Sequence, residues 1–228
     1  MPVWTVAIET VATAGSVALL CGDELHTEHV LPPALRSAKT LAAAVRSIWT
    51  EAGRPPVSLV AVAKGPGSFT GLRVGVITAK ALAYAWGAQL IGVNSLDSVA
   101  AQAPTATRPG DLLDVILEAQ RQELFVASFQ ALESRQWERK MTDIVTPVEK
   151  WLPNVPQLVS GPPLKKLREK IPDPVQIAPE ATWNPTAATV GRLAIQQQRA
   201  GAADELWTLV PHYIRPTYAD EKRGQTHG

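Results

Sequence analysis

The sequence is poor in cysteine, in charge of one sign and in long apolar runs, and each shortage excludes a class of protein. Cys21 is the one cysteine among 228 residues, so no disulfide can form within the chain, which suits a reducing compartment. The formal net charge is +1, whereas a domain that binds nucleic acid by itself usually carries a clear basic excess. No apolar stretch approaches the roughly 20 residues of a membrane helix, and the first residues lack the features of a signal peptide. We therefore expect a cytoplasmic protein without a membrane partner.

Three catalytic signatures are missing as well. The chain contains no His-Glu-x-x-His zinc motif, no Gly-x-Ser-x-Gly elbow and no Walker loop ending in Gly-Lys-Ser/Thr. His26 and His29 lie three residues apart in a strand-like run, so their side chains should point to opposite faces and make a poor metal pair. From these absences we expect no catalytic residue and no stoichiometric metal in this chain.

What is present is an alternation of strand and helix patterns that is typical of α/β proteins. Apolar runs of strand length are found at 3–9, 16–21, 24–31, 57–63 and 89–93. Helical periodicity predicts helices at 36–52, from a Gly-rich loop to about 86, and at 95–102, where Ser95 is the expected cap.

The second half of the chain begins like the first. Strand patterns at 112–118 and 123–129 flank a short turn, and a third strand is possible at 136–144. This echo predicts a duplicated α/β unit. Because proline and glycine cluster at 104–110, we expect one lobe at 1–104 and a smaller one at 105–228, with a flexible tail from about 217. In the proline-rich remainder, a strand is expected at 157–160 and helices near 163–170 and 186–200.

Seven tryptophans are many for this length. Those in apolar settings are expected to anchor the core or an interface: Trp4, Trp49, Trp86 and Trp207. Those in polar or proline-rich settings are candidates for surface stacking: Trp137, Trp151 and Trp183.

The Gly-rich loop between the strand at 57–63 and the next helix allows three interpretations. Its residues are Lys64-Gly65-Pro66-Gly67-Ser68-Phe69-Thr70-Gly71-Leu72-Arg73. An anion could bind at the helix N-terminus, which Ser68 or Thr70 would cap. The glycines could instead supply unusual dihedrals for a sharp turn, which is the interpretation that the residues alone favour. A nucleotide P-loop is excluded, because the Walker lysine is missing.

The helix that follows this loop mixes small and large apolar residues. The small ones are Gly71, Gly75, Ala79, Ala81, Ala83 and Ala85, and the large ones are Leu72, Val76, Ile77, Leu82, Tyr84 and Trp86. Small residues let another backbone approach closely, either that of the chain's own sheet or that of a second protein. The alanine-rich helix at 36–52 has the same character, so the two helices could form half of a four-helix interface.

Residues 65–83, GPGSFTGLRVGVITAKALA, resemble the signature of the TsaB (YeaZ) family. The resemblance continues at 6–20, 91–101 and 115–129, and again at Pro211-His212-Tyr213-Ile214-Arg215-Pro216. It implies an actin-like, sugar-kinase-like fold (ribonuclease H-like, ASKHA) with two duplicated lobes. It also implies a scaffolding subunit that activates a larger TsaD-like catalytic subunit, beside a TsaE-like ATPase, in forming N6-threonylcarbamoyladenosine at position 37 of tRNA. The tRNA would be contacted only indirectly, and ATP with magnesium would bind only in the assembled complex.

The sequence departs from this family pattern in three places. Glu9 replaces the usual Asp of the first turn, Glu118-Ala119-Gln120 replaces Asp-Ala-Arg in the second hairpin, and Ser37 lies near a position where histidine is frequent. In actin-like kinases the two acidic turns help to hold metal and phosphate. Longer side chains and a missing arginine therefore reduce Glu9, Thr10 and Glu118 to a possible vestigial nucleotide site.

The resemblance leads us to expect that two helices bind the partner, or a second copy of the chain when it is alone. The expected contacts are Leu41, Val45 and Trp49 on the first helix and Phe69, Leu72, Val76, Ala79 and Lys80 on the second. Two alternatives stay open: a weak ATPase or phosphotransferase of the actin-like superfamily, and an inactive M22 metallopeptidase-like chaperone. The basic run Lys165, Lys166, Arg168 and Lys170 could touch RNA phosphates, although a solvated helix face explains it more simply.

Overall fold

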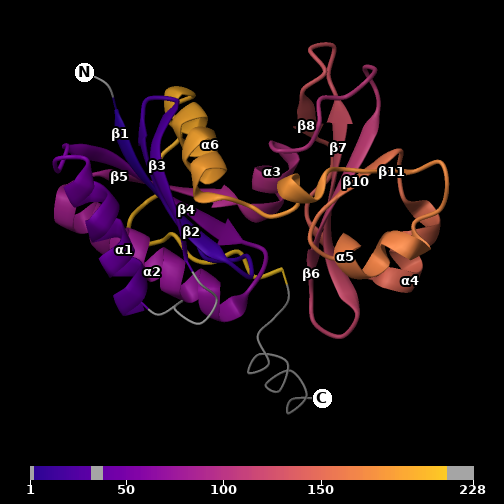
Figure 1. Cartoon of the computed structure of the whole chain (residues 1–228), viewed down its shortest axis with the longest axis horizontal. Helices are drawn as coiled ribbons and strands as arrows, with labels where there is room; N and C mark the ends of the chain where they lie inside the picture. The colour runs from indigo at the N-terminus through magenta and orange to yellow at the C-terminus, as the bar shows by residue number, and fades with distance from the viewer. Residues whose placement is uncertain (1–2, 32–37, 215–228) are drawn as a thin grey trace.

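The computed structural model describes residues 3–31 and 38–214, which form two lobes, each around one mixed β-sheet (Figure 1). The first sheet has the strand order β3-β2-β1-β4-β5. Its strands are β1 (Trp4–Glu9), β2 (Gly15–Cys21), β3 (Glu24–Leu31), β4 (Val57–Gly65) and β5 (Gln89–Asn94). β1, β2 and β3 pair antiparallel, whereas β1, β4 and β5 pair parallel. The five strands predicted from apolar runs are thereby confirmed.

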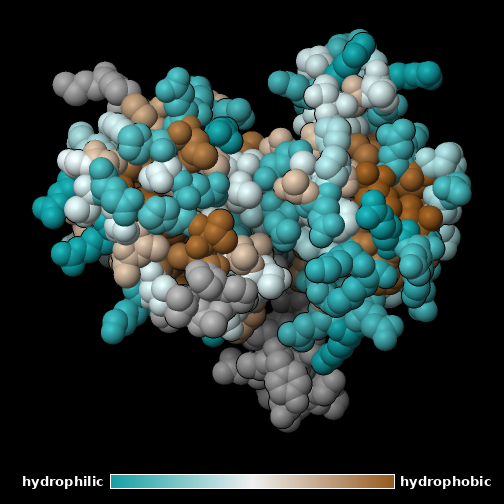
Figure 2. Space-filling model, in the orientation of Figure 1, coloured by the Kyte–Doolittle hydropathy of each residue, from teal (hydrophilic) through white to brown (hydrophobic). Residues whose placement is uncertain are grey.

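Helices cover both faces of the first sheet. α1 (Ala38–Glu51) and α2 (Phe69–Trp86) pack on the outer face, and α6 (Ala187–Arg199) packs on the face turned toward the second lobe (Figure 1). β4 is buried along most of its length, as expected for a parallel strand with helices on both sides. Figure 2 shows a mostly hydrophilic outer surface in this orientation, with apolar residues reaching it in limited patches.

The second sheet has the order β11-β10-β6-β7-β8, and β9 also pairs with β7. Its strands are β6 (Leu112–Glu118), β7 (Glu123–Ala131), β8 (Trp137–Arg139), β9 (Ile144–Pro147), β10 (Leu158–Ser160) and β11 (Gln176–Ile177). α3 (Ser95–Ala100) packs on the inner face, while α4 (Val148–Trp151) and α5 (Leu164–Leu167) pack on the outer face. Three 3-10 turns complete the lobe: η2 (Leu152–Asn154), η3 (Arg168–Lys170) and η4 (Glu180–Thr182). The single strand expected at 136–144 is in fact β8 and the start of β9.

The division at residue 104 needs a correction, because the C-terminal part of the chain returns to the first lobe. α6 packs on β1, β2 and β4, and its Gly191 is glycine because a Cβ there would lie 2.5 Å from the Leu20 side chain. Residues 203–214, which we name the C-terminal strap, follow: Asp204 N donates to Leu90 O, and His212 N donates to Lys64 O. The expected tail from about 217 lies outside the described residues.

Tryptophan positions show how far tertiary packing departs from local sequence. Trp151 and Trp183, which were candidates for surface stacking, are 5% and 3% exposed in the core of the second lobe. Trp207, expected to be an anchor in an apolar setting, is 73% exposed. A smaller correction concerns α3, where Asn94 rather than Ser95 is the cap, since the Asn94 side chain accepts from Leu96 N and Asp97 N.

No helix within residues 3–31 and 38–214 combines the length and the apolar character that crossing a bilayer requires.

Asp114 on β6 is a buried carboxyl that yields a pH prediction. Burial raises its pKa above 3.8, and hydrogen bonds from Ser128 Oγ (2.6 Å) and Trp151 Nε1 (2.8 Å) oppose that rise. A raised carboxyl pKa means that this group stabilises the fold below about pH 3.8 and loses that contribution as the pH rises through the folded-state pKa.

Asp114→Asn should therefore be more stable than the natural chain at neutral pH, and the difference should vanish toward pH 3.8. The amide oxygen can still accept from Trp151, and the amide nitrogen can donate to Ser128 Oγ. Urea unfolding at several pH values measures the difference. Asp114→Ala is the control, because it leaves both donors without a partner and should cost about 1–3 kcal/mol. An Asn variant that is less stable at neutral pH would contradict the prediction.

Candidate functional site

The Gly-rich loop is packed directly against the turn that follows β1. A Cβ on Gly71 would lie 1.9 Å from Thr10 O, and one on Gly75 would lie 2.3 Å from Thr10 Oγ1. A Cβ on Gly67, whose φ is +148°, would lie 1.9 Å from Val11 Cγ1. Ser68 caps α2, as predicted, by accepting from Gly71 N at 3.3 Å. The glycines therefore allow a close backbone approach within the lobe, which supports the structural interpretation of this loop.

Glu9 and Thr10 lie where the turn after β1 packs against the Gly-rich loop. Both are buried, at 0% and 1% exposure. Glu9 Oε1 accepts from Val11 N and from Ala12 N, and Thr10 Oγ1 donates to Gly71 O at 2.7 Å. These hydrogen bonds hold the turn after β1 and the start of α2 together.

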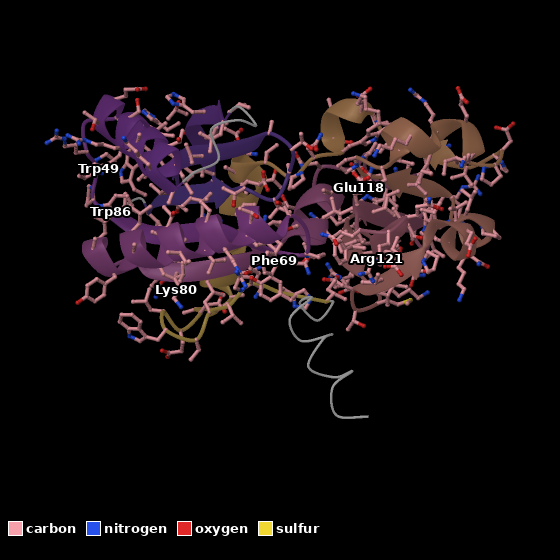
Figure 3. The ribbon with its side chains drawn as sticks, turned by 90° about the horizontal axis from the view of Figure 1, so that it is seen from below. Trp49, Phe69, Lys80, Trp86, Glu118 and Arg121 are labelled. Carbon is pink, nitrogen blue, oxygen red and sulfur yellow. The ribbon has the colours of Figure 1, made fainter. Side chains whose placement is uncertain are left out.

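An open cleft of about 1550 Å³ separates the two lobes and lies beside this junction. Val11, Ala12 and the start of α2 line one wall, the β6–β7 turn and α5 line the other, and the end of the C-terminal strap closes one side. Figure 3 looks along this region from below, with Phe69 on one side and Glu118 and Arg121 on the other. Glu118 is a surface group whose carboxylate lies 2.8 Å from Lys166 Nζ.

The vestigial nucleotide site therefore needs a correction. Of its three candidate residues, only Glu118 lines the cleft, and Glu9 and Thr10 are sealed behind Val11 and Ala12. Glu9 Oε1 accepts hydrogen bonds from two backbone N–H groups of its own turn, those of Val11 and Ala12.

An aromatic and cationic cluster marks the mouth of the cleft on the first lobe. The Arg73 guanidinium lies over the Phe69 ring, 3.9 Å from its centroid, and Arg73 Nε donates to Tyr213 Oη at 3.2 Å. The Phe69 and Tyr213 rings lie 5.2 Å apart. This cluster joins the start of α2 to the C-terminal strap, and its members remain exposed.

The expected partner contacts need a larger correction. Five of them are at most 2% exposed and belong to the chain's own core: Leu41, Val45, Leu72, Val76 and Ala79. Trp49 is half-buried against Trp86, with ring centroids 5.6 Å apart. Only Phe69, at 40% exposure, and Lys80 stay near the surface, and Lys80 Nζ donates to Trp207 O and Leu209 O of the C-terminal strap. The buried apolar residues of α1 and α2 pack against the first sheet.

A different set of α2 residues forms the exposed face. Ile77 and Tyr84 are 65% and 70% exposed, and Ala81 lies exposed between them. The Tyr84 ring lies 5.8 Å from the Trp207 ring of the strap. The sequence held a signal for this face: Thr70, Arg73 and Lys80 mark the polar side of an amphipathic helix, and Ile77 and Tyr84 fall on that side.

A charged network joins the lobes on the other side of the strap. Arg139 of β8 donates to Asp97 Oδ1 from Nε (2.8 Å) and Nη2 (2.6 Å), and its Nη1 donates to Asp143 Oδ1. Asp143 also accepts from Asn94 Nδ2, and His212 Nε2 lies 3.4 Å from Asp143 Oδ2. Burial raises the pKa of Asp97, while the charge and hydrogen bonds of Arg139 lower it. The network fixes the end of β5, the second sheet and the strap relative to one another.

Comparisons with known proteins identify the family. A family model described as TsaD, tRNA N6-adenosine threonylcarbamoyltransferase, matches residues 33–206. The tRNA threonylcarbamoyladenosine biosynthesis protein TsaB of Bacillus subtilis is 28% identical over 95% of this chain and 96% of its own. TsaB of Escherichia coli is 32% identical over 61% of this chain and 60% of its own. YeaZ from Pseudomonas aeruginosa is similar in structure, with a TM-score of 0.74 and 25% identity over 92% of this chain and all of its own. The chain belongs to the family that this model describes, and the relatives named here are TsaB (YeaZ) proteins.

The TsaB assignment confirms the resemblance that residues 65–83 carry, together with the duplicated, actin-like two-lobe fold. The structure also shows where the departures at Glu118 and Gln120 lie, whereas Ser37 is outside the described residues. Glu118 and Gln120 lie on the second-lobe wall of the cleft, beside Arg121. Arg121 and Gln122 form the turn between β6 and β7 with φ of +62° and +59°, a conformation that residues with a Cβ seldom adopt.

Proposed function

We propose that this chain is a non-catalytic subunit of the complex that forms N6-threonylcarbamoyladenosine in tRNA, and that it binds and activates a TsaD-like catalytic subunit. The names of its B. subtilis and E. coli relatives support the pathway. The observation that carries the scaffolding role is the exposed apolar face of α2, where Ile77 and Tyr84 are 65% and 70% exposed on an otherwise regular helix.

The neighbours of this face suit a protein partner. On one side of α2, α1 exposes the small residues Ala42 and Ala43 with Arg46 beside them, so another helix could approach closely. On the other side, Trp207 and Val210 of the C-terminal strap are 73% and 66% exposed. A surface with exposed aromatic and aliphatic side chains in the middle and cations at the margin is typical of a protein interface.

The site geometry supports a role without chemistry. Glu9 and Thr10, the residues best placed by sequence to hold a nucleotide, are engaged in backbone contacts at the start of α2. Among residues 3–31 and 38–214, no three His, Cys, Asp or Glu side chains gather as a metal site would require. Catalysis would then reside in the TsaD-like subunit, ATP and magnesium would bind only in the assembled cytoplasmic complex, and a TsaE-like ATPase would join it. A second copy of this chain would occupy the α2 face when the partner is absent.

Co-purification tests this proposal. Ile77→Glu together with Tyr84→Glu places two carboxylates on the α2 face without entering the core, so the fold should persist while capture of a tagged TsaD-like subunit is lost. Met141→Glu is the matched control, because it charges a residue that is 48% exposed on the second lobe. If the double variant still captures the partner and its circular dichroism is unchanged, the α2 face is not the docking surface.

Titration with ATP and magnesium separates this role from the enzymatic alternative. We expect neither micromolar binding nor turnover by the isolated chain. Turnover that is lost on changing Glu118 or Arg121 would instead favour an actin-like phosphotransferase.

A further inference from the structure

The structure divides the basic run of α5 and η3 into two pairs. Lys166 and Lys170, four residues apart, line the interlobe cleft, whereas Lys165 and Arg168 are exposed elsewhere and do not line it. This segment thus directs two of its four cations into the cleft. The pair of Lys166 with Glu118 is 75% and 67% exposed, so it is worth at most about 1 kcal/mol and exchanges readily for another anion.

The opposite wall offers a flat surface beside these charges. Arg73 lies over the Phe69 ring and is held by Tyr213 Oη, so the guanidinium plane is fixed at the cleft mouth. Arginine planes and aromatic rings are the groups on which unpaired RNA bases stack. Arg121, at the tip of the β6–β7 turn, lines the same cleft from the second lobe (Figure 3).

The charge and the volume of the cleft indicate which kind of ligand it could bind. Four cationic side chains line the cleft (Arg73, Arg121, Lys166 and Lys170) against two acidic ones (Glu118 and Glu123), although the whole chain is close to neutral. Its volume of about 1550 Å³ exceeds the roughly 300–1,000 Å³ of typical small-molecule sites. Glu9 and Thr10, two of the three residues considered for a nucleotide site, are buried and do not line the cleft, whereas the four cations that suit a longer anion do.

We propose that the interlobe cleft binds a single-stranded segment of RNA. Phosphates would face Lys166, Lys170 and Arg121, and a base would stack on the Arg73–Phe69 surface. This inference rests on the proposed function, in which tRNA is the substrate of the complex. It replaces the expectation that this chain contacts tRNA only indirectly. Because the net charge of the chain is small, the partner subunit would supply most of the affinity for RNA, and the cleft would add to it.

A pair of double variants within the segment formed by α5 and η3 tests the proposal. Lys166→Ala with Lys170→Ala removes the cleft-facing charges, and Lys165→Ala with Arg168→Ala removes the same charge from the same segment outside the cleft. Affinity for a fluorescein-labelled anticodon stem-loop RNA is measured by anisotropy, with the full chain assembled with its TsaD-like subunit. Each lost contact to unpaired RNA should cost about fivefold near 0.1 M salt, so the cleft pair should cost roughly 25-fold and flatten the log–log salt slope by about 1.4.

A variant that removes a negative charge from the cleft, and should therefore strengthen RNA binding, adds a second test. Glu118→Gln removes the acidic partner of Lys166 and should tighten RNA binding by roughly threefold, with a slightly steeper salt dependence. The control pair should stay within about twofold of the natural chain.

Three results would overturn the inference. Equal losses from both pairs would mean diffuse attraction to the surface, and no loss from the cleft pair would mean that the RNA does not enter. Competition by ATP at the same residues would make the cleft a nucleotide site. Co-purification of the TsaD-like subunit, measured on the same variants, should be unchanged, so that failure of the RNA contact is separable from failure of the docking proposal.

Discussion

Gly71→Ala should destabilise the chain by about 3 kcal/mol, although the same change in an ordinary helix would stabilise it by about 1 kcal/mol through helix propensity. The added Cβ would lie 1.9 Å from Thr10 O and 3.0 Å from Thr10 C, and these are backbone atoms that cannot rotate away. The clash would also separate Thr10 Oγ1 from Gly71 O, which breaks the hydrogen bond that ties α2 to the first strand. Denaturant unfolding followed by circular dichroism measures the loss.

Gly87→Ala provides the control, because it makes the same chemical change at the other end of α2, where no atom lies within 4 Å of the new Cβ. Its φ of +61° is unfavourable for alanine, so a cost of about 1 kcal/mol is expected from the backbone alone. Equal effects of the two substitutions would show that the contact with Thr10 does not constrain the loop.

Arg139→Met should also destabilise the chain by about 3 kcal/mol, since it leaves Asp97 and Asp143 facing each other without their shared cation. The Asp143 side chain is only 4% exposed, so water cannot replace the guanidinium. Without Arg139, burial raises the pKa of Asp97 with less opposition. A raised carboxyl pKa favours the folded state at low pH, so the stability gap from the natural chain should narrow as the pH falls from about 7 to about 4.

The contrasting variant is Arg199→Met, which breaks a pair of similar length between Arg199 and Asp23, 2.8 Å apart. Both side chains there are more than half exposed, so the expected loss is at most about 1 kcal/mol. Thermal melts of both variants across pH make the comparison. If the two losses are alike, the interlobe network does not fix the lobes.

Local patterns predicted the elements well and the functional surface poorly. The strand at 57–63 and the helix at 70–86 were predictable because a short apolar run, helical periodicity and glycines at the boundary are all local patterns. The predicted partner surface was wrong because Leu72, Val76 and Ala79 were expected to contact another protein, although they are buried in the core of their own lobe. Periodicity finds the apolar side of a helix but says nothing about what covers it.

The C-terminal strap illustrates the second kind of failure. Asp204 accepts from Gly92 N, 112 positions earlier in the chain, and Lys80 holds strap carbonyls from the middle of α2. Nothing in residues 203–214 indicates these partners, so the assignment of all residues after 105 to the second lobe followed from sequence order alone. The strap creates much of the candidate surface, since it brings Trp207 and Tyr213 beside Tyr84 and Phe69.

By itself, the sequence determined the two α/β halves, the capped helix after the Gly-rich loop and the TsaB signature at 65–83, because each depends on residues that are close together in the chain. Only the tertiary structure decided that Glu9 and Thr10 are sealed, that Ile77 and Tyr84 face outward, and that Lys166 and Lys170 share a cleft with Arg73. Burial and charge proximity are properties of the packed chain, and contacts between distant segments set them.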